Sequence, residues 1–216
     1  LERDPVPREI RSYWADRAVG GPAGFGHLAV DLGRVVRDGL GAIIDELAHL
    51  ADDGDSAQQD CRRAMRIGCR AVIDWAHRYA EAADCRAAER ADAEEAGLHR
   101  RVAAACRRVP EHPACDLFEA LQAVALVHLA IHIEGHGYSV SVGGLDQVLA
   151  PFVDEIDREF DRNVDLIGAF LLKLAANTMF GSHSKTQAIT IGGRDAVGRD
   201  RGNAATLAVL EAFDRV

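Results

Sequence analysis

Residues 117–133 of the chain read LFEALQAVALVHLAIHI, and this stretch decides the fold. Its apolar side chains fall on nearly every side of a helical projection, which is typical of a helix that protein covers all round. Asp116 precedes the stretch and Glu119 follows three residues later, an arrangement that favours a capped helix start. The stretch is too short to cross a bilayer. We therefore expect it to form the most buried helix of the molecule.

Helical spacing of apolar residues recurs on both sides of this stretch. It predicts further helices over residues 28–50, 60–83, 85–109, 145–156, 166–174 and 203–213. Residues 135–144 are rich in glycine and predict an irregular loop or a short extended segment. Residues 187–191 alternate in polarity and are β-branched, which makes them the best strand candidate. The sequence thus predicts a mainly α fold with one or two short strands.

Composition excludes several classes of protein. The chain has 216 residues, 48% of them hydrophobic, so a packed core is expected. Its formal net charge of -9 argues against a nucleic-acid partner, because phosphate binding needs a basic surface. We see no signal peptide and expect no membrane partner.

The cysteines indicate the compartment. There are five of them, an odd number, and no C-x-x-C pair occurs among Cys61, Cys69, Cys85, Cys106 and Cys115. This pattern fits a reducing cytoplasm better than a disulfide framework or a zinc site. We expect cytoplasmic localisation and cysteines that act as small buried hydrophobic residues.

Several short motifs occur in a fixed order along the chain. They are Ser12-Tyr13-Trp14, Gly26-His27 with Asp31, residues 80–91, 106–110, 113–114 and 118–122, residues 137–141 with Gly143, Asp146, Gln147 and Pro151, residues 172–174, and residues 187–193 with Gly198, Asp200, Asn203 and 210–212. In this order they resemble the pyruvate formate-lyase (PFL) domain of glycyl radical enzymes, and its diol-dehydratase-like members most of all. The resemblance implies an N-terminal arm at residues 1–26 and a partial PFL-like domain at residues 27–216. The implied fold is the helical N-terminal portion of a glycyl radical enzyme α/β barrel.

Two motifs of the family do not occur in the sequence. Family members carry a catalytic cysteine in a G-C-x-E loop and a radical glycine in an R-V-x-G-[FWY] loop, and neither pattern is present. The family arginine before the Asp146-Gln147 pair is Gly144 here. The resemblance implies formate acetyltransferase, lyase or dehydratase chemistry that begins when a thiyl radical abstracts a hydrogen atom. We expect this chain alone to be inactive, as a fragment, a split half or a degenerate homologue.

The resemblance also implies partners and cofactors. The substrate would be a small carbonyl compound or polyol. No cofactor is expected to bind this chain itself, whereas the complete family member carries a glycyl radical installed by an S-adenosylmethionine radical activating enzyme. That activating enzyme, or the missing half of the barrel, is an expected partner. Self-association is expected if residues 117–133 expose apolar surface.

Three residues are implied as substrate contacts. In diol-dehydratase-like members the Gly-His motif and the G-[HY]-S-x-S loop reach the substrate hydroxyls, which points to His27, Tyr138 and Ser139 here. Imidazole and hydroxyl groups suit a polyol because each can donate and accept hydrogen bonds. We expect Asp146 and Gln147 to tie the loop down rather than to touch substrate.

Two alternatives come from other features. His128, His132 and His136 are spaced four residues apart and could bind zinc with Glu134, although the order is H-x-E-x-H rather than H-E-x-x-H. Hydrogen-bonded core histidines are the competing interpretation. The chain could also be a non-catalytic helical binding or assembly module, or one half of a split enzyme.

Overall fold

The structure is a computed structural model that describes residues 28–50, 54–135, 140–154, 159–176 and 188–216. The predicted N-terminal arm, residues 1–26, lies outside these residues. The described chain is mainly helical, as predicted, and its elements are α2 (Leu32–His49), α3 (Ser56–Glu89), α4 (Ala93–Arg108), α5 (Leu117–Gly135), α6 (Leu145–Leu149), the 3₁₀ turn η1 (Ala150–Phe152), α7 (Phe160–Ala176) and α8 (Ala204–Arg215). None of the described helices combines the length and the apolar character that a membrane span requires.

The described residues also form four strands of two residues each, where the sequence predicted one or two. Strand β1 (Leu28–Ala29) pairs in parallel with β2 (Val140–Ser141), and β3 (Gly143–Gly144) pairs in parallel with β4 (Ile189–Thr190). Strand β4 lies in the best strand candidate, residues 187–191, and β2 and β3 lie in residues 135–144, where a loop or a short extended segment was predicted. Strand β1 lies where a helix was predicted, and its pairing with a partner distant in sequence is something no local pattern reveals.

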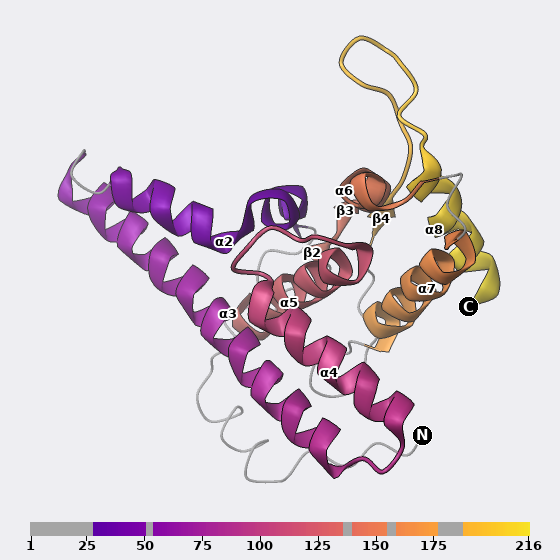
Figure 1. Cartoon of the computed structure of the whole chain (residues 1–216). Coiled ribbons are helices and arrows are strands. Elements are labelled where there is room, and N and C mark those ends of the chain that lie inside the picture. The colour runs from indigo at the N-terminus through magenta and orange to yellow at the C-terminus, as the bar shows by residue number, and fades with distance from the viewer. Residues whose placement is uncertain (1–27, 51–53, 136–139, 155–158, 177–187) are drawn as a thin grey trace, which may run out of the picture.

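Helix α5 lies at the centre of the arrangement (Figure 1). It contacts α2, α3 and α4 on one side and α6 and α7 on the other. Of residues 117–133 only Ile133 is exposed, which confirms that this is the most buried helix. Its start is capped as predicted, because the Asp116 carboxylate accepts the Glu119 amide hydrogen at 2.8 Å. The Glu119 carboxylate in turn accepts a bond from the backbone of Cys115 at 2.8 Å.

Helices α3 and α4 form a long antiparallel hairpin, seen in purple and magenta in Figure 1. Its interface consists mainly of alanines, which let the two backbones approach closely: Ala76, Ala80, Ala83 and Ala103 are buried there beside Cys106. Helices α7 and α8 form a second pair on the far side of α5. The larger core cluster joins this pair to α5 and to the first half of α2.

Helix α2 is broken at Gly39, where the sequence predicted one continuous helix. Gly39 has φ +79° and ψ 160°, a conformation that only glycine adopts readily. The turn that follows α4 enters the break. Its carbonyl groups accept hydrogen bonds from the backbone N–H groups of Leu40 (Pro110 O, 2.7 Å) and Gly41 (Glu111 O, 2.9 Å). The break therefore fastens α2 to the connection between α4 and α5.

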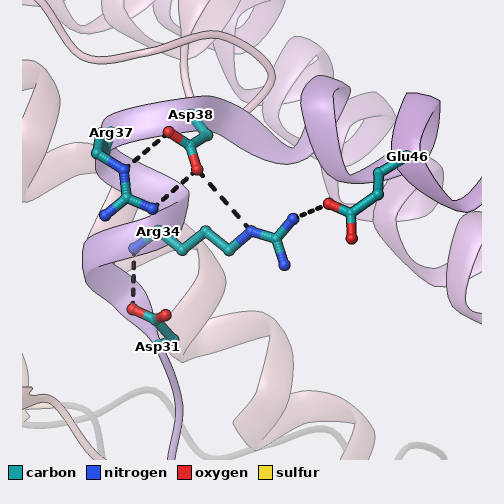
Figure 2. Close-up of polar contacts among 5 residues, drawn as sticks. All are labelled: Asp31, Arg34, Arg37, Asp38 and Glu46. Atoms are coloured by element: carbon teal, nitrogen blue, oxygen red, sulfur yellow. Dashed lines mark hydrogen bonds and ion pairs between the residues drawn. The ribbon is translucent and has the colours of Figure 1, made fainter.

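Charged side chains bridge the two halves of α2. Figure 2 shows Arg34, in the first half, reaching Glu46 in the second. Arg37 holds the neighbouring carboxylate of Asp38 through two hydrogen bonds of 2.9 Å. These groups are exposed, so they contribute little to stability compared with the backbone bonds at the break.

Replacement of Gly39 by alanine tests the role of the break. A Cβ atom at this position would lie 2.2 Å from the carbonyl oxygen of Glu111. We expect Gly39→Ala to lower the free energy of unfolding by about 3 kcal/mol, from the unfavourable φ and the steric overlap together. Urea denaturation followed by circular dichroism measures the change.

Gly68→Ala is the matched control. Gly68 lies within α3 and a Cβ atom there would meet nothing within 4 Å. Alanine is the better helix former, so this variant should be as stable as the parent or slightly more stable. Equal stability of both variants would show that the α2 break is not constrained by the turn.

Candidate functional site

The three predicted substrate contacts, His27, Tyr138 and Ser139, lie outside the described residues. The structure does describe the strands that follow them on the chain. Leu28, the residue after His27, pairs with Val140, the residue after Ser139, and Ala29 pairs with Ser141. The pairing is parallel, so both strands run in the same direction from these starting points. Two segments separated by more than a hundred residues are thus neighbours in the fold.

His128 holds helix α5 against strand β2. The ring is fully buried, and its Nε2 lies 2.9 Å from the carbonyl oxygen of Val140. Because a carbonyl oxygen only accepts, Nε2 is the protonated nitrogen of the neutral ring. Burial lowers the pKa of His128 to about 4; the bond to Val140 opposes this effect and the neighbouring His132 adds to it. His128 is therefore neutral near pH 7.

His132 lies one turn further along α5. The centroids of the two imidazole rings are 4.3 Å apart, and the ring planes are tilted by 50°. The Nδ1 atom of His132 donates to the carbonyl oxygen of His128 at 2.8 Å, which leaves a lone pair on Nε2. That Nε2 atom is buried and has no hydrogen-bond partner among the described residues. His128 and His132 are therefore hydrogen-bonded core histidines, as one interpretation of the sequence predicted, and only the Nε2 atom of His132 is left without a partner among the described residues.

A metal site at these histidines lacks ligands in the described part of the chain. No group of three or more histidine, cysteine, aspartate or glutamate side chains there is arranged to hold a metal ion. His136, the third member of the predicted set, lies outside the described residues. One nitrogen of each described ring is already bonded to a backbone carbonyl.

Asp146, in helix α6, links the segment that follows β4 to helix α8. Its side chain is fully buried and accepts bonds from Gly192 N at 2.7 Å and from the Thr206 hydroxyl at 2.6 Å. The backbone and side-chain amides of Gln147 also donate to this carboxylate, at 2.8 and 3.1 Å. A carboxylate with several donors remains stable inside a protein without a cationic partner.

Gln147 extends this network to the loop between β4 and α8, which projects from the body in Figure 1. Its side-chain amide donates to the carbonyl oxygen of Arg201 at 2.9 Å and accepts from the guanidinium of the same residue at 3.2 Å. The loop that Asp146 and Gln147 fasten contains residues 192–201, which come much later in the chain. Their predicted role in holding the loop of residues 137–141 stays a prediction, because residues 136–139 lie outside the described part of the chain.

The cysteines are less uniform than the sequence predicted. Cys106 is buried, and burial raises the pKa of its thiol to about 11, so it remains protonated. Cys69 is half-buried. Cys61, Cys85 and Cys115 are exposed, which makes the prediction of buried thiols wrong for these three. Cys61 and Cys85 lie on the outward face of α3, where the apolar spacing of that helix misled the prediction.

Comparison with known proteins identifies the family. A family model described as pyruvate formate lyase-like matches residues 13–216. The chain therefore belongs to the pyruvate formate lyase-like family, as its motifs predicted.

The curated relatives are dehydratases and lyases. The chain is 28% identical to the probable dehydratase YbiW of Escherichia coli, over 90% of this chain and 27% of the relative. It is 27% identical to the (2S)-3-sulfopropanediol dehydratase of Klebsiella oxytoca, over 88% of this chain and 25% of that enzyme. The chain thus spans about a quarter of the length of these relatives.

The solved structures that it resembles are glycyl radical enzymes. The B12-independent glycerol dehydratase of Clostridium butyricum, in its glycerol-bound form, superposes with a TM-score of 0.79 at 27% identity, over 89% of this chain and 26% of that one. A glycyl radical enzyme of Archaeoglobus fulgidus gives a TM-score of 0.74 at 28% identity, over 89% of this chain and 27% of that one. These likenesses support the predicted class.

Acid stability tests the buried histidine. Folding lowers the pKa of His128, so the unfolded chain binds the proton more tightly than the folded chain does. The stability that the neutral His128 contributes is therefore fully present above about pH 6.5 and is lost as the pH falls toward 4. We expect His128 to contribute about 2 kcal/mol of the stability lost between pH 7.5 and pH 5. His128→Gln, which keeps a donor for Val140 and cannot titrate, should lose correspondingly less over that interval in urea denaturation. Exposed His49→Gln should behave like the parent, and an unchanged pH dependence in His128→Gln would contradict the assignment.

Asp146→Asn tests the buried carboxylate. The amide places an N–H group where Gly192 and Thr206 both donate, so at least one buried donor loses its acceptor. The free energy of unfolding should fall by about 3 kcal/mol. Asp214→Asn, an exposed change in the last turn of α8, serves as the control. Equal denaturation midpoints for the two variants would disprove the role given to Asp146.

Proposed function

We propose that the chain forms the substrate-binding side of a glycyl radical dehydratase or lyase that acts on a small hydroxylated compound. The observation that carries the proposal is the parallel pairing of Leu28 with Val140. His27 and Ser139 each come one residue before these paired residues in the sequence, which supports the proposal that the two side chains act on one substrate. Family membership and the glycerol-bound structural relative favour a polyol as the substrate.

In this proposal the residues of the chain bind and orient the substrate. The imidazole of His27 and the hydroxyls of Tyr138 and Ser139 would hydrogen-bond substrate hydroxyls and fix the carbon that reacts. His128 supports them indirectly, because it fastens the backbone of Val140 next to Ser139. In this class of enzyme a glycyl radical supplies the hydrogen abstraction. None of the five cysteines here stands in the G-C-x-E context of the class, so we propose that the chain by itself binds substrate without turnover.

Binding of glycerol by the purified chain tests the proposal. Line broadening or saturation-transfer NMR should detect glycerol in the millimolar range, as expected for a few hydrogen bonds in an open site. His27→Ala and Ser139→Ala should each weaken binding about 3- to 10-fold, because each removes one hydrogen bond.

Two matched controls sharpen this experiment. Ser141→Ala removes a hydroxyl from strand β2, two residues after Ser139 in the sequence, and His49→Ala removes an exposed histidine from the end of α2. Both should leave glycerol binding unchanged. Equal losses in the control and test variants, or the absence of any glycerol signal, would contradict the proposed substrate side.

A further inference from the structure

Helix α3 carries an apolar groove along one side. The groove has a volume of about 810 Å³, and its walls come from α3, from the C-terminal half of α5 and from Leu40 of α2. Three large apolar side chains in its walls remain exposed: Met65 is 52% exposed, Ile67 61% and Ile133 51%. Soluble proteins rarely leave large apolar patches uncovered, so this groove points to a binding partner.

The side of α3 that borders the groove is shaped to lie against a second helix. Helix α3 lies at the outer edge of the molecule in Figure 1. Along this side, mostly small side chains recur every three or four residues, which is the heptad spacing of two packed helices. These seam residues are Cys61, Ala64, Gly68, Ala71, the half-buried Trp75, Arg78, Ala82 and Cys85, and all but Trp75 are exposed. Small side chains let two backbones approach closely, as they do in the α3–α4 interface.

The spacing of the seam is the same in both directions about residue 73. A second copy of α3 that runs antiparallel, related by a twofold axis, therefore sets every seam residue opposite another seam residue. Cys61 of one copy lies opposite Cys85 of the other. The aliphatic stem of Arg78 lies opposite Gly68, where a Cβ atom would meet nothing within 4 Å and space is left for it.

The charges at the two ends of the seam are complementary in this arrangement. Asp60 precedes the seam and Arg86 follows it, and both side chains are exposed. An antiparallel pair places each Asp60 opposite an Arg86, whereas a parallel pair would place like charges together. We propose that this side of α3 binds a second copy of the chain as an antiparallel, twofold-symmetric helix pair.

The size of this contact sets its expected strength. Residues 60 and 86 are separated by about 39 Å along the helix axis, at 1.5 Å per residue. One helix face with the rim of a groove is at the small end of specific interfaces. We therefore expect a reversible dimer with a dissociation constant of about 10–100 µM.

Sedimentation velocity of the purified chain under reducing conditions tests the dimer. Ala64→Glu places a carboxylate in the seam and should weaken association at least about 10-fold. Ala88→Glu is the matched control, because Ala88 is exposed on another side of α3, and it should associate like the parent. A chain that stays monomeric at about 500 µM, well above the expected dissociation constant, would overturn the proposal. Equal association of the two variants would also overturn it.

A charge swap tests the antiparallel direction. Asp60→Arg and Arg86→Asp should each weaken association about 3- to 10-fold, and the double variant should recover the affinity of the parent. Within one chain the two residues are too far apart to touch, so recovery can come only from contact between copies. Oxidation with copper phenanthroline should join Cys61 to Cys85 between copies. Absence of recovery, or peptides that join Cys61 to Cys61, would refute the antiparallel pair, and neither outcome depends on glycerol binding.

Discussion

The requirement that helix α5 be covered on every side determines how the rest of the molecule is arranged. A helix with apolar side chains all round loses stability wherever water reaches it, at roughly 25 cal/mol for each Å² of apolar surface. The chain meets this requirement with two helix pairs, α3 with α4 and α7 with α8, and with the first half of α2 between them. Each end of α5 then meets a different set of short segments, and the polar chemistry of the molecule is found at those ends.

The backbone connections around α5 depend on a few positions that tolerate no substitute. The α4–α5 connection enters helix α2 at Gly39, where backbone atoms approach too closely for a Cβ atom. At the opposite side, the Asp146 carboxylate collects donors from three separate segments. Neither contact buries much apolar surface. Both fix the relative positions of segments that hydrophobic packing alone would allow to slide.

The sequence predicted the helices well because their apolar spacing is local. Residues 117–133 have no polar face, and that alone identified the most buried helix. The break at Gly39 was missed because apolar residues continue in helical spacing on both sides of it, and its cause is a turn some seventy residues later. Strand β1 was missed for the same reason, since two residues carry no periodicity, whereas β2 and β3 lie in residues 135–144, where a loop or a short extended segment was predicted.

The candidate substrate contacts show how far the sequence reaches. His27, Tyr138 and Ser139 were predicted from motifs and stay predictions. The pairing of β1 with β2 brings together the residues that follow His27 and Ser139, and no local sequence pattern could reveal that pairing.

The two ends of α5 bury polar groups by opposite means. At the β2 end, burial keeps His128 neutral, and one bond to Val140 satisfies its single donor. At the other end, charged groups remain close together because each arginine has a carboxylate beside it. The same helix thus supports two environments that differ in charge.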